Sequence, residues 1–273
     1  MASILFMSTR EKGHVFPLLG PAQWLLRLGH RVAWLCLPSC PDWLERMGIE
    51  PVSLELPSAE TEEFVSGGPE LAALVRDSER LFPWIKRLLV DDVQGLVEPT
   101  RAALRASGCD ILVVDPMIYQ GIIAAHLEGI PYVCPSSSLN PITPTDLDVP
   151  HNRNMRRLDP DRRALFASFG MHPEFRVADC ISPFANTVFT TREYVGDVDL
   201  PPRTHLVGPS LPPDGRPSIE GNPALPSGKV PLIYVSFGSQ IYHQPEIFDL
   251  VTTATAGLGV RVLLVCGPLA ASE

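Results

Sequence analysis

Short apolar runs alternate with longer segments of helical period through the first half of the chain. The apolar runs are residues 3–8, 31–37, 51–54, 111–115 and 131–134. They are continuously apolar rather than alternating, which is typical of strands that helices cover on both faces. The pattern therefore predicts an α/β fold built on a Rossmann-like, doubly wound parallel sheet.

Two strand-helix-strand units follow from this pattern. Residues 15–28 place their leucines mostly on one helical face, and Gly29 supplies the left-handed stop that precedes the second strand. Residues 118–128, followed by Gly129, repeat the plan later in the chain. Because such crossovers are right-handed, we expect the sheet order 3-2-1-4-5, in which the first and fourth strands are neighbours.

Two polar regions interrupt the pattern. Residues 56–68 are acidic and precede a helical segment at 71–105, while residues 135–160 are rich in Ser, Pro, Asp and Asn. We expect 56–68 and 135–160 to be surface excursions. The second leads into five arginines: Arg153, Arg156, Arg157, Arg162 and Arg163. They indicate either a solvated helix face with Asp159 and Asp161 as local partners or an anion site, and we favour the first.

A shift in composition divides the chain. Residues 208–230 are crowded with Pro and Gly and have almost no helical or strand period, which indicates an interdomain linker. After it a new α/β pattern begins, with a strand at 232–236, a helix at 246–257 and a strand at 260–266. We therefore predict an N-terminal domain at 1–207 and the start of a second, incomplete Rossmann-like domain at 231–273.

Composition excludes some classes of protein. The 273 residues are 45% hydrophobic and carry a formal net charge of −9, which opposes binding to nucleic acid. The start lacks a basic region and a long apolar run, so we expect no signal peptide, no membrane span and a cytoplasmic protein. The six cysteines form no CxxC pair, and we expect buried thiols rather than a metal site or disulfides. They are Cys36, Cys40, Cys109, Cys134, Cys180 and Cys266.

A histidine and an aspartate follow two of the predicted strands. His14 lies in the loop after the first strand, and Asp115 closes the fourth. Ligands collect at the carboxyl ends of parallel strands where the strand order reverses, so the two side chains can meet there as a base and its orienting carboxylate. Alternatively, His14 begins a helix with backbone partners, and Asp115, before Pro116, is a cap or turn former. The sequence has no GxGxxG, P-loop, HExxH or GxSxG motif, so dinucleotide, P-loop, zinc-hydrolase and serine-hydrolase chemistry lack their signatures.

Four segments of the chain carry a resemblance to a known family. They are, in order, GHVFPLLGPAQWLLRLGHRV, DILVVDP, HLVGPSLP and PLIYVSFGSQ. This combination, around a Pro-rich linker, resembles the GT-B glycosyltransferases of the UDP-glycosyltransferase and macrolide glycosyltransferase type. Those enzymes transfer a sugar from a nucleotide sugar to a small lipophilic acceptor. The resemblance runs the length of the chain.

The resemblance implies a catalytic pair. His14 would be the general base that deprotonates the acceptor hydroxyl, and Asp115 would hold it and stabilise its charge. Direct displacement at the anomeric carbon would invert its configuration and would require no carboxylate nucleophile. The resemblance also implies a UDP or TDP sugar as co-substrate, with no other cofactor and no metal.

The resemblance further indicates where substrates bind. Gly238, Ser239 and Gln240 follow a strand of the second domain, where backbone N–H groups suit the phosphates of the donor; the alternative is a tight turn. The acceptor is expected in an apolar pocket of the first domain. Its candidate residues are Phe82, Trp84, Ile85, Ser136, Ser137 and Asn140, although Trp and Phe at helical spacing are also typical of a core.

The sequence departs from the family in its second domain. The family's motifs for the base, ribose, diphosphate and sugar lie mostly beyond the last residue of this chain. We therefore expect an incomplete donor site, either in a truncated chain or in one whose missing half comes from a partner chain. Two functions stay open: an inverting glycosyltransferase that needs a donor domain, and a non-catalytic acceptor-binding module derived from one.

Overall fold

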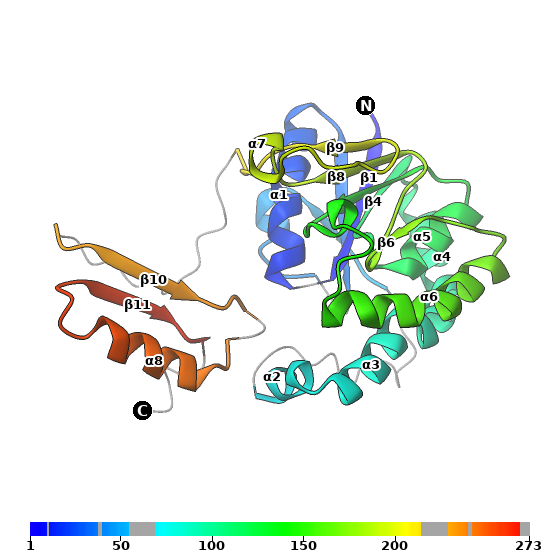
Figure 1. The fold of residues 1–273 in the computed structure, drawn as a ribbon. Helices are drawn as coiled ribbons and strands as arrows, with labels where there is room; N and C mark the ends of the chain where they lie inside the picture. Colours follow the sequence, from blue (N-terminus) through cyan, green and yellow to red (C-terminus); the bar gives the residue numbers. More distant parts are fainter. Residues whose placement is uncertain (10, 38–39, 55–68, 214–228, 240–241, 268–273) are drawn as a thin grey trace. The chain divides into compact units, whose positions relative to one another are not determined.

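The computed structural model describes residues 1–9, 11–37, 40–54, 69–213, 229–239 and 242–267 (Figure 1). Contacts divide the chain into two compact units, residues 1–61 with 82–216, and residues 62–81 with 217–273. The acidic excursion predicted at 56–68 and most of the predicted linker at 208–230 lie outside the described residues.

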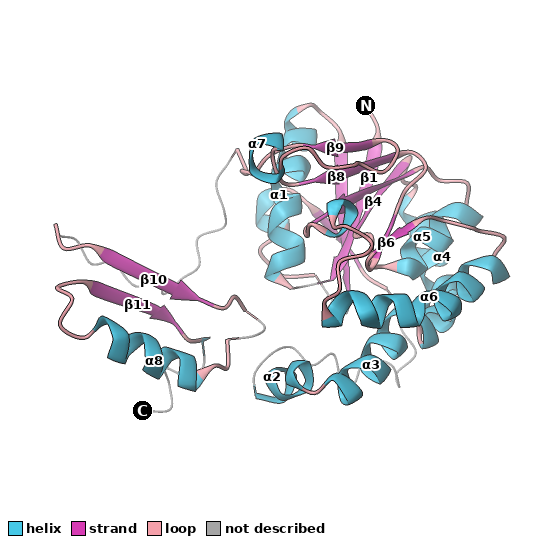
Figure 2. Cartoon of the chain, viewed as in Figure 1, coloured by secondary structure: helices cyan, strands magenta, loops and turns pink. Residues whose placement is uncertain are grey.

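The first unit is built on a parallel sheet (Figure 2). Its seven strands follow the order β3-β2-β1-β4-β5-β8-β9, and every neighbouring pair is parallel. This confirms the predicted order of the first five strands and adds two at one edge. The strands are β1 (Ser3–Thr9), β2 (Arg31–Leu37), β3 (Glu50–Val52), β4 (Ile111–Val114), β5 (Tyr132–Ser136), β8 (Ala185–Val188) and β9 (Thr204–Leu206).

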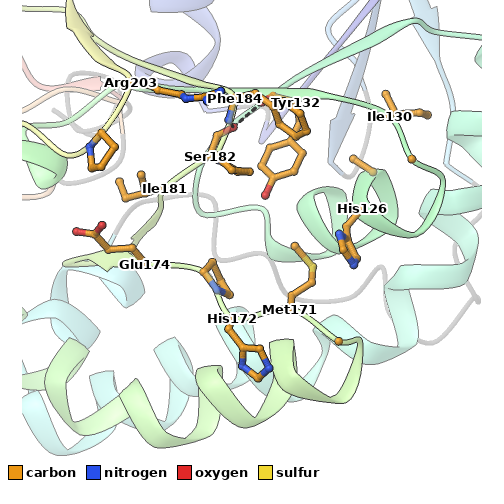
Figure 3. Close-up of a pocket in the computed structure, with 16 residues that line it drawn as sticks. His126, Ile130, Tyr132, Met171, His172, Glu174, Ile181, Ser182, Phe184 and Arg203 are labelled. Carbon is orange, nitrogen blue, oxygen red and sulfur yellow. Dashed lines mark hydrogen bonds between the residues drawn. The ribbon is translucent and has the colours of Figure 1, made fainter.

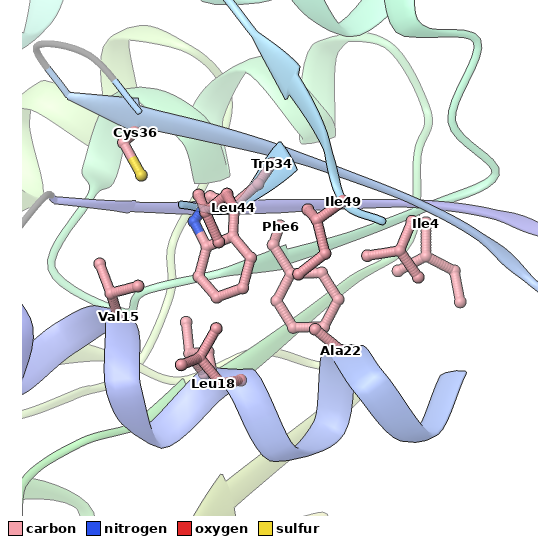
Figure 4. Packing of buried hydrophobic residues seen from close by; sticks show 11 residues of the cluster. Ile4, Phe6, Val15, Leu18, Ala22, Trp34, Cys36, Leu44 and Ile49 are labelled. Atoms are coloured by element: carbon pink, nitrogen blue, oxygen red, sulfur yellow. The ribbon is translucent and has the colours of Figure 1, made fainter. Parts of the chain in front are cut away.

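Helices cover both faces of this sheet, as the apolar strands require. On one face α1 (Lys12–Arg27) packs on β1 and β2, where Phe6 and Trp34 stack with ring centroids 4.9 Å apart (Figure 4). The indole N–H of Trp34 donates to the Ser8 hydroxyl at 2.9 Å, so this buried polar group is satisfied. On the other face α5 (Tyr119–Leu127) lies against Met7 of β1. The fold is therefore the predicted doubly wound sheet.

The helical region predicted at 71–105 is interrupted. It divides into α2 (Pro69–Arg76), α3 (Ser78–Lys86), a π-helical turn η2 (Arg87–Asp91) and α4 (Val93–Ser107). Asp77 separates the first two, and its carboxylate accepts the backbone N–H groups of Glu79 and Arg80 at 3.1 and 3.3 Å, which caps α3. Helical period alone did not reveal this break.

The second half of the predicted surface excursion at 135–160 is helical and partly buried, since Asn152, Met155 and Leu158 lie in the interior. The helix α6 (Pro150–Ser168) begins there, because Pro150 is favourable at the first helical position. Between β5 and α6 lies a short 3₁₀ turn, η3 (Asn140–Ile142). After α6 come a small antiparallel pair, β6 (Phe175–Arg176) with β7 (Asp179–Cys180), and the short helix α7 (Arg192–Val195).

The arginines of α6 have local partners. Arg153 and Arg156 pair with Asp148 at 2.9 and 3.2 Å, and Arg162 pairs with Asp159. These arginines therefore have local acidic partners, as the interpretation as a helix face expects. Arg162 differs from that interpretation because it is buried rather than solvated. Its guanidinium donates to the carbonyl of Val177 at 2.5 Å and joins α6 to the β6–β7 turn.

The second unit contains the predicted strand-helix-strand. β10 (Leu232–Ser236) pairs in parallel with β11 (Arg261–Val265), and α8 (Pro245–Thr255) connects them. In the same unit Arg76, at the end of α2, donates to the side-chain oxygen of Gln244 at 2.5 Å. The side chains of Tyr234 and Leu250 are 62% and 65% exposed, so this unit carries apolar surface.

All six cysteines are free thiols. Four of them are buried, as expected, while Cys40 and Cys266 are half-buried. Among the described residues, none of the helices is both long and apolar enough to span a bilayer.

Candidate active site

His14 lies in the first turn of α1, immediately beyond the carboxyl end of β1. Its backbone N–H bonds to the carbonyl of Glu11 at 2.9 Å, which fixes the start of the helix. Asp115 directly follows β4, and its backbone N–H bonds to the carbonyl of Met7 at 2.9 Å. Because β1 and β4 are neighbours in the sheet, both side chains reach the same edge.

The structure brings the two side chains into contact. His14 Nδ1 and Asp115 Oδ2 are 2.5 Å apart. The other carboxylate oxygen of Asp115 accepts the backbone N–H of Met117 at 3.0 Å, so the buried carboxylate is held in one orientation. With the Nδ1 proton donated to Asp115, the lone pair of the neutral imidazole is on Nε2. The helix-start and turn roles are also present, so the two interpretations of these residues are compatible.

The environment of His14 favours its protonated form. Burial lowers the pKa of the imidazole, but the hydrogen bond and charge of Asp115, with smaller contributions from Glu11 and Asp179, outweigh it. The pKa of His14 is therefore raised above 6.5. The side chain is still 29% exposed, so a ligand at this edge has access to the ring.

A serine-rich loop lies beside this pair. Ser137, in the loop after β5, is exposed, and its hydroxyl lies 3.5 Å from His14 Nδ1. Ser136 is buried and Asn140 half-buried. The structure therefore brings one of the two predicted acceptor regions next to the catalytic candidates, whereas the binding role of these residues stays a prediction.

A second acidic residue, which the sequence did not indicate, lies at this place. Asp179 of β7 is buried, and its carboxylate accepts from the Ser136 hydroxyl at 2.5 Å and from the Asn140 side-chain amide at 2.7 Å. Burial raises the pKa of Asp179 to about 7, although the hydrogen bonds from Asn140 and Ser136 lower it. The segment RVADC around it has no motif or period that could have indicated this position.

The other predicted acceptor region is α3. Phe82 and Ile85 are buried, and the Arg157 guanidinium of α6 lies 3.8 Å from the centroid of the Phe82 ring. These two side chains therefore contribute to packing, as the alternative interpretation had it. Trp84 is half-buried and retains surface for a ligand.

The donor candidates belong to the second unit. Gly238 has a positive φ of 76°, which favours glycine, and its N–H bonds to the Ser236 hydroxyl at 3.2 Å. Gly238 and Ser239 are both exposed after β10. Gln240 lies outside the described residues. The tight turn is thus present, and a role in phosphate binding stays a prediction.

A cavity of about 620 Å³ lies elsewhere in the first unit (Figure 3). Its lining includes Tyr132, Ser182, Phe184 and Arg203, at the amino-terminal ends of β5, β8 and β9. None of the predicted site residues lines it. Since His14 and Asp115 lie at the opposite ends of parallel strands, this cavity is distinct from the candidate site. No cluster of three or more potential metal-ligating side chains occurs among the described residues.

Comparison with known proteins supports the fold. No protein-family model matches the sequence. The chain is 26% identical over 288 residues to demethyllactenocin mycarosyltransferase of Streptomyces fradiae, a match that covers 98% of this chain and 59% of that relative. The chain thus spans about 59% of the length of the curated relative it matches.

Solved structures give the same result. The glycotransferase of kitacinnamycin aligns with a TM-score of 0.60 and 21% identity, over 97% of this chain and 66% of that one. Spinosyn rhamnosyltransferase complexed with thymidine diphosphate aligns with a TM-score of 0.59 and 16% identity, over 95% of this chain and 64% of that one. The chain therefore has the GT-B fold of these solved structures, and the curated relative that it resembles is itself named as a glycosyltransferase.

Proposed function

We propose that this chain carries the acceptor site and the general base of an inverting glycosyltransferase, which transfers a sugar from a nucleotide sugar to a hydroxyl of a small lipophilic natural product. The observation that carries this proposal is the contact of 2.5 Å between His14 and Asp115 at the carboxyl edge of the sheet. Doubly wound folds bind their ligands at this edge.

The pair suits the chemistry of the transfer. A hydroxyl is a weak nucleophile at neutral pH, and a positioned base contributes about 10²- to 10⁴-fold to its reaction. His14 Nε2 takes the acceptor proton while the acceptor oxygen forms a bond to the anomeric carbon. The bond from that carbon to the diphosphate breaks, and the diphosphate leaves with the electron pair. Asp115 stabilises the imidazolium that forms, and a single displacement inverts the anomeric configuration.

The names of the relatives support the choice of substrates. The structural neighbour named above binds thymidine diphosphate, and the curated relative is named for demethyllactenocin as its acceptor. We assign the donor diphosphate to the turn at Gly238 and Ser239, where backbone N–H groups can contact phosphate. The proposal includes a UDP or TDP sugar as co-substrate, no resident cofactor or metal, and a cytoplasmic location.

A transfer assay tests the proposal. The chain is incubated with UDP- and TDP-sugars and with demethyllactenocin as probe acceptor, both alone and with the C-terminal half of the Streptomyces fradiae relative added. Glycosylated product is measured by mass spectrometry, and its anomeric configuration by NMR. We expect an inverted product, and a loss of about 10²-fold or more in rate for His14→Ala. His205→Ala, at an exposed position of β9, is the matched control and should retain the rate.

The outcomes separate the two functions. Product formed at a near-normal rate by a folded His14→Ala chain contradicts the assignment of the base. Binding of the acceptor without transfer, in every combination of donor and added domain, identifies a non-catalytic acceptor-binding module instead.

A further inference from the structure

Asp179 is a buried carboxyl group close to the catalytic candidates. The residue is 1% exposed and lies in the two-residue strand β7. Among the described residues, Asp179 has no ion pair within 4.0 Å. The buried guanidinium of Arg162 pairs with Asp159 instead. Burial of a carboxyl group without an ion pair is unfavourable unless hydrogen bonds compensate for the lost hydration.

Those hydrogen bonds hold the two ends of one loop. One carboxylate oxygen accepts from Ser136, at the end of β5, and the other from Asn140, at the start of η3. Within the loop, the backbone N–H of Ser138 bonds to the Ser136 hydroxyl at 3.3 Å, and that of Asn140 bonds to the Ser138 hydroxyl at 3.1 Å. The segment 136–140 is therefore fixed through a single acidic side chain from a distant part of the chain.

The residue between these anchors faces the site. Ser137 is exposed, and its hydroxyl lies 3.5 Å from the His14 ring nitrogen that contacts Asp115. The loop thus borders the imidazole whose other nitrogen, Nε2, is the proposed base. We propose that Asp179 is a positioning residue of the transferase site, which holds the 136–140 loop so that Ser137 lies beside the general base where the acceptor binds. This inference rests on the proposed function.

Asp179 and His14 also interact electrostatically. The charge of Asp115 helps to raise the pKa of Asp179, the charge of His14 lowers it, and Asp179 in turn raises the pKa of His14. The other titratable groups that interact with Asp179 are the thiols of Cys134 and Cys180 and the phenol of Tyr119, all of which have raised pKa values. Because these three groups stay neutral near pH 7, a proton gained or lost by this cluster at neutral pH is distributed between Asp179 and His14.

Two substitutions distinguish the positioning of the loop by Asp179 from the effect of its charge. Asp179→Asn removes the charge, but its amide can accept from Asn140 and donate to Ser136, so the loop should stay in place. Asp179→Ala removes both anchors. Asp148→Ala is the matched control, because Asp148 is an exposed acidic residue that pairs with arginines of α6.

Two NMR measurements on the full chain need no turnover. In the wild type, the His14 imidazole should report two titration steps, its own and one near pH 7 from Asp179. We expect Asp179→Asn to remove the second step. For the backbone amides of Ser137 and Ser138, we expect order parameters of about 0.85 in the wild type and Asp179→Asn, and below about 0.6 in Asp179→Ala. Asp148→Ala should change neither result.

The transfer assay adds a third readout. Because the base is retained, Asp179→Ala should raise the acceptor KM about tenfold while kcat falls less, and Asp179→Asn should stay within about twofold in KM. A folded Asp179→Ala chain with a rigid loop and an unchanged KM overturns the inference. Should that variant fail to fold, the double variant Ser136→Ala, Asn140→Ala removes the same two anchors from the side of the loop, and order parameters of Ser137 and Ser138 that stay at about 0.85 in it overturn the inference. Absence of transfer in the wild type would contradict the proposed function and leave the two NMR results to decide this inference.

Discussion

The protonation state of His14 depends on the carboxylate beside it. Burial lowers the pKa of the imidazole, and Asp115 supplies the two largest contributions that raise it above 6.5. A general base acts in its neutral form, so activity should rise with pH through this raised value. The linkage to stability has the opposite direction: the contact stabilises the fold fully below pH 6.5, and this stabilisation is lost as pH rises through the raised pKa of the folded state.

Asp115→Asn tests this dependence. The amide carries no charge and offers one acceptor oxygen in place of the two that face His14 and Met117, so burial of His14 should then dominate, and the pKa of its imidazole should fall below the wild-type value. The midpoint of the rising limb of activity should move to lower pH, and the maximal rate should fall because the imidazolium loses its counter-charge. NMR titration of His14 in the wild type and the variant measures the first effect. An unchanged pKa of His14 would show that Asp115 has no electrostatic role.

Part of this site could be predicted from the sequence. His14 and Asp115 each follow a continuous apolar run, and the order of parallel strands then places them at one edge. Asp179 lies 43 residues from its partner Ser136 and belongs to a strand of two residues, so no period or spacing marks it. Its place depends on how the chain returns after α6, which is a tertiary property.

Among the elements, the long apolar strands were predictable and the short polar ones were not. β1 and β2 are continuous apolar runs, whereas β8 (ANTV) and β9 (THL) are short and partly polar. They extend the sheet through backbone pairing of β8 with β5 and of β9 with β8, which local sequence does not encode. The breaks in the 71–105 region were not predicted for a related reason: the helical period of the sequence continues through Asp77 and the π-helical turn η2.

The close packing of α5 on the sheet depends on Gly121. A Cβ at Gly121 would lie 2.7 Å from Met7 Sδ and 3.0 Å from Val114 Cγ2, both on strands that lead to the site. In a helix, alanine is otherwise favoured over glycine by about 1 kcal/mol. We expect Gly121→Ala to destabilise the first unit by a net amount of about 1 to 2 kcal/mol, because overpacking a core exceeds that gain.

Gly13→Ala is the matched control for this comparison. Gly13 is a helical glycine of α1, and a Cβ there would meet nothing within 4 Å. It should stabilise the protein by up to about 1 kcal/mol. Urea unfolding followed by circular dichroism measures both variants. If Gly121→Ala is as stabilising as Gly13→Ala, the contact of α5 with β1 and β4 is looser than the distances indicate.

At the scale of the whole molecule, the two units differ in how much core each holds. The first unit has a sheet covered on both faces and a buried cluster around Phe6 and Trp34. The described part of the second unit has two paired strands, the connecting helix α8 and the helix α2, with Tyr234 and Leu250 exposed. A two-stranded sheet is marginally stable in water, and unpaired apolar edges promote aggregation.

A chain that ends at Pro213 tests whether the first unit is independent. It keeps the complete sheet and the contact between His14 and Asp115, so we expect one cooperative unfolding transition in urea and an NMR titration of His14 like that of the full chain. The helix α2 would lose the contact of Arg76 with Gln244 and should become mobile without lowering the main transition. Light scattering during heating should show less aggregation than in the full chain, because the exposed apolar surface of β10 and α8 is gone. An unfolded or markedly less stable shortened chain would mean that the segment from Leu232 onward completes the core of the first unit, and that the two units fold as one.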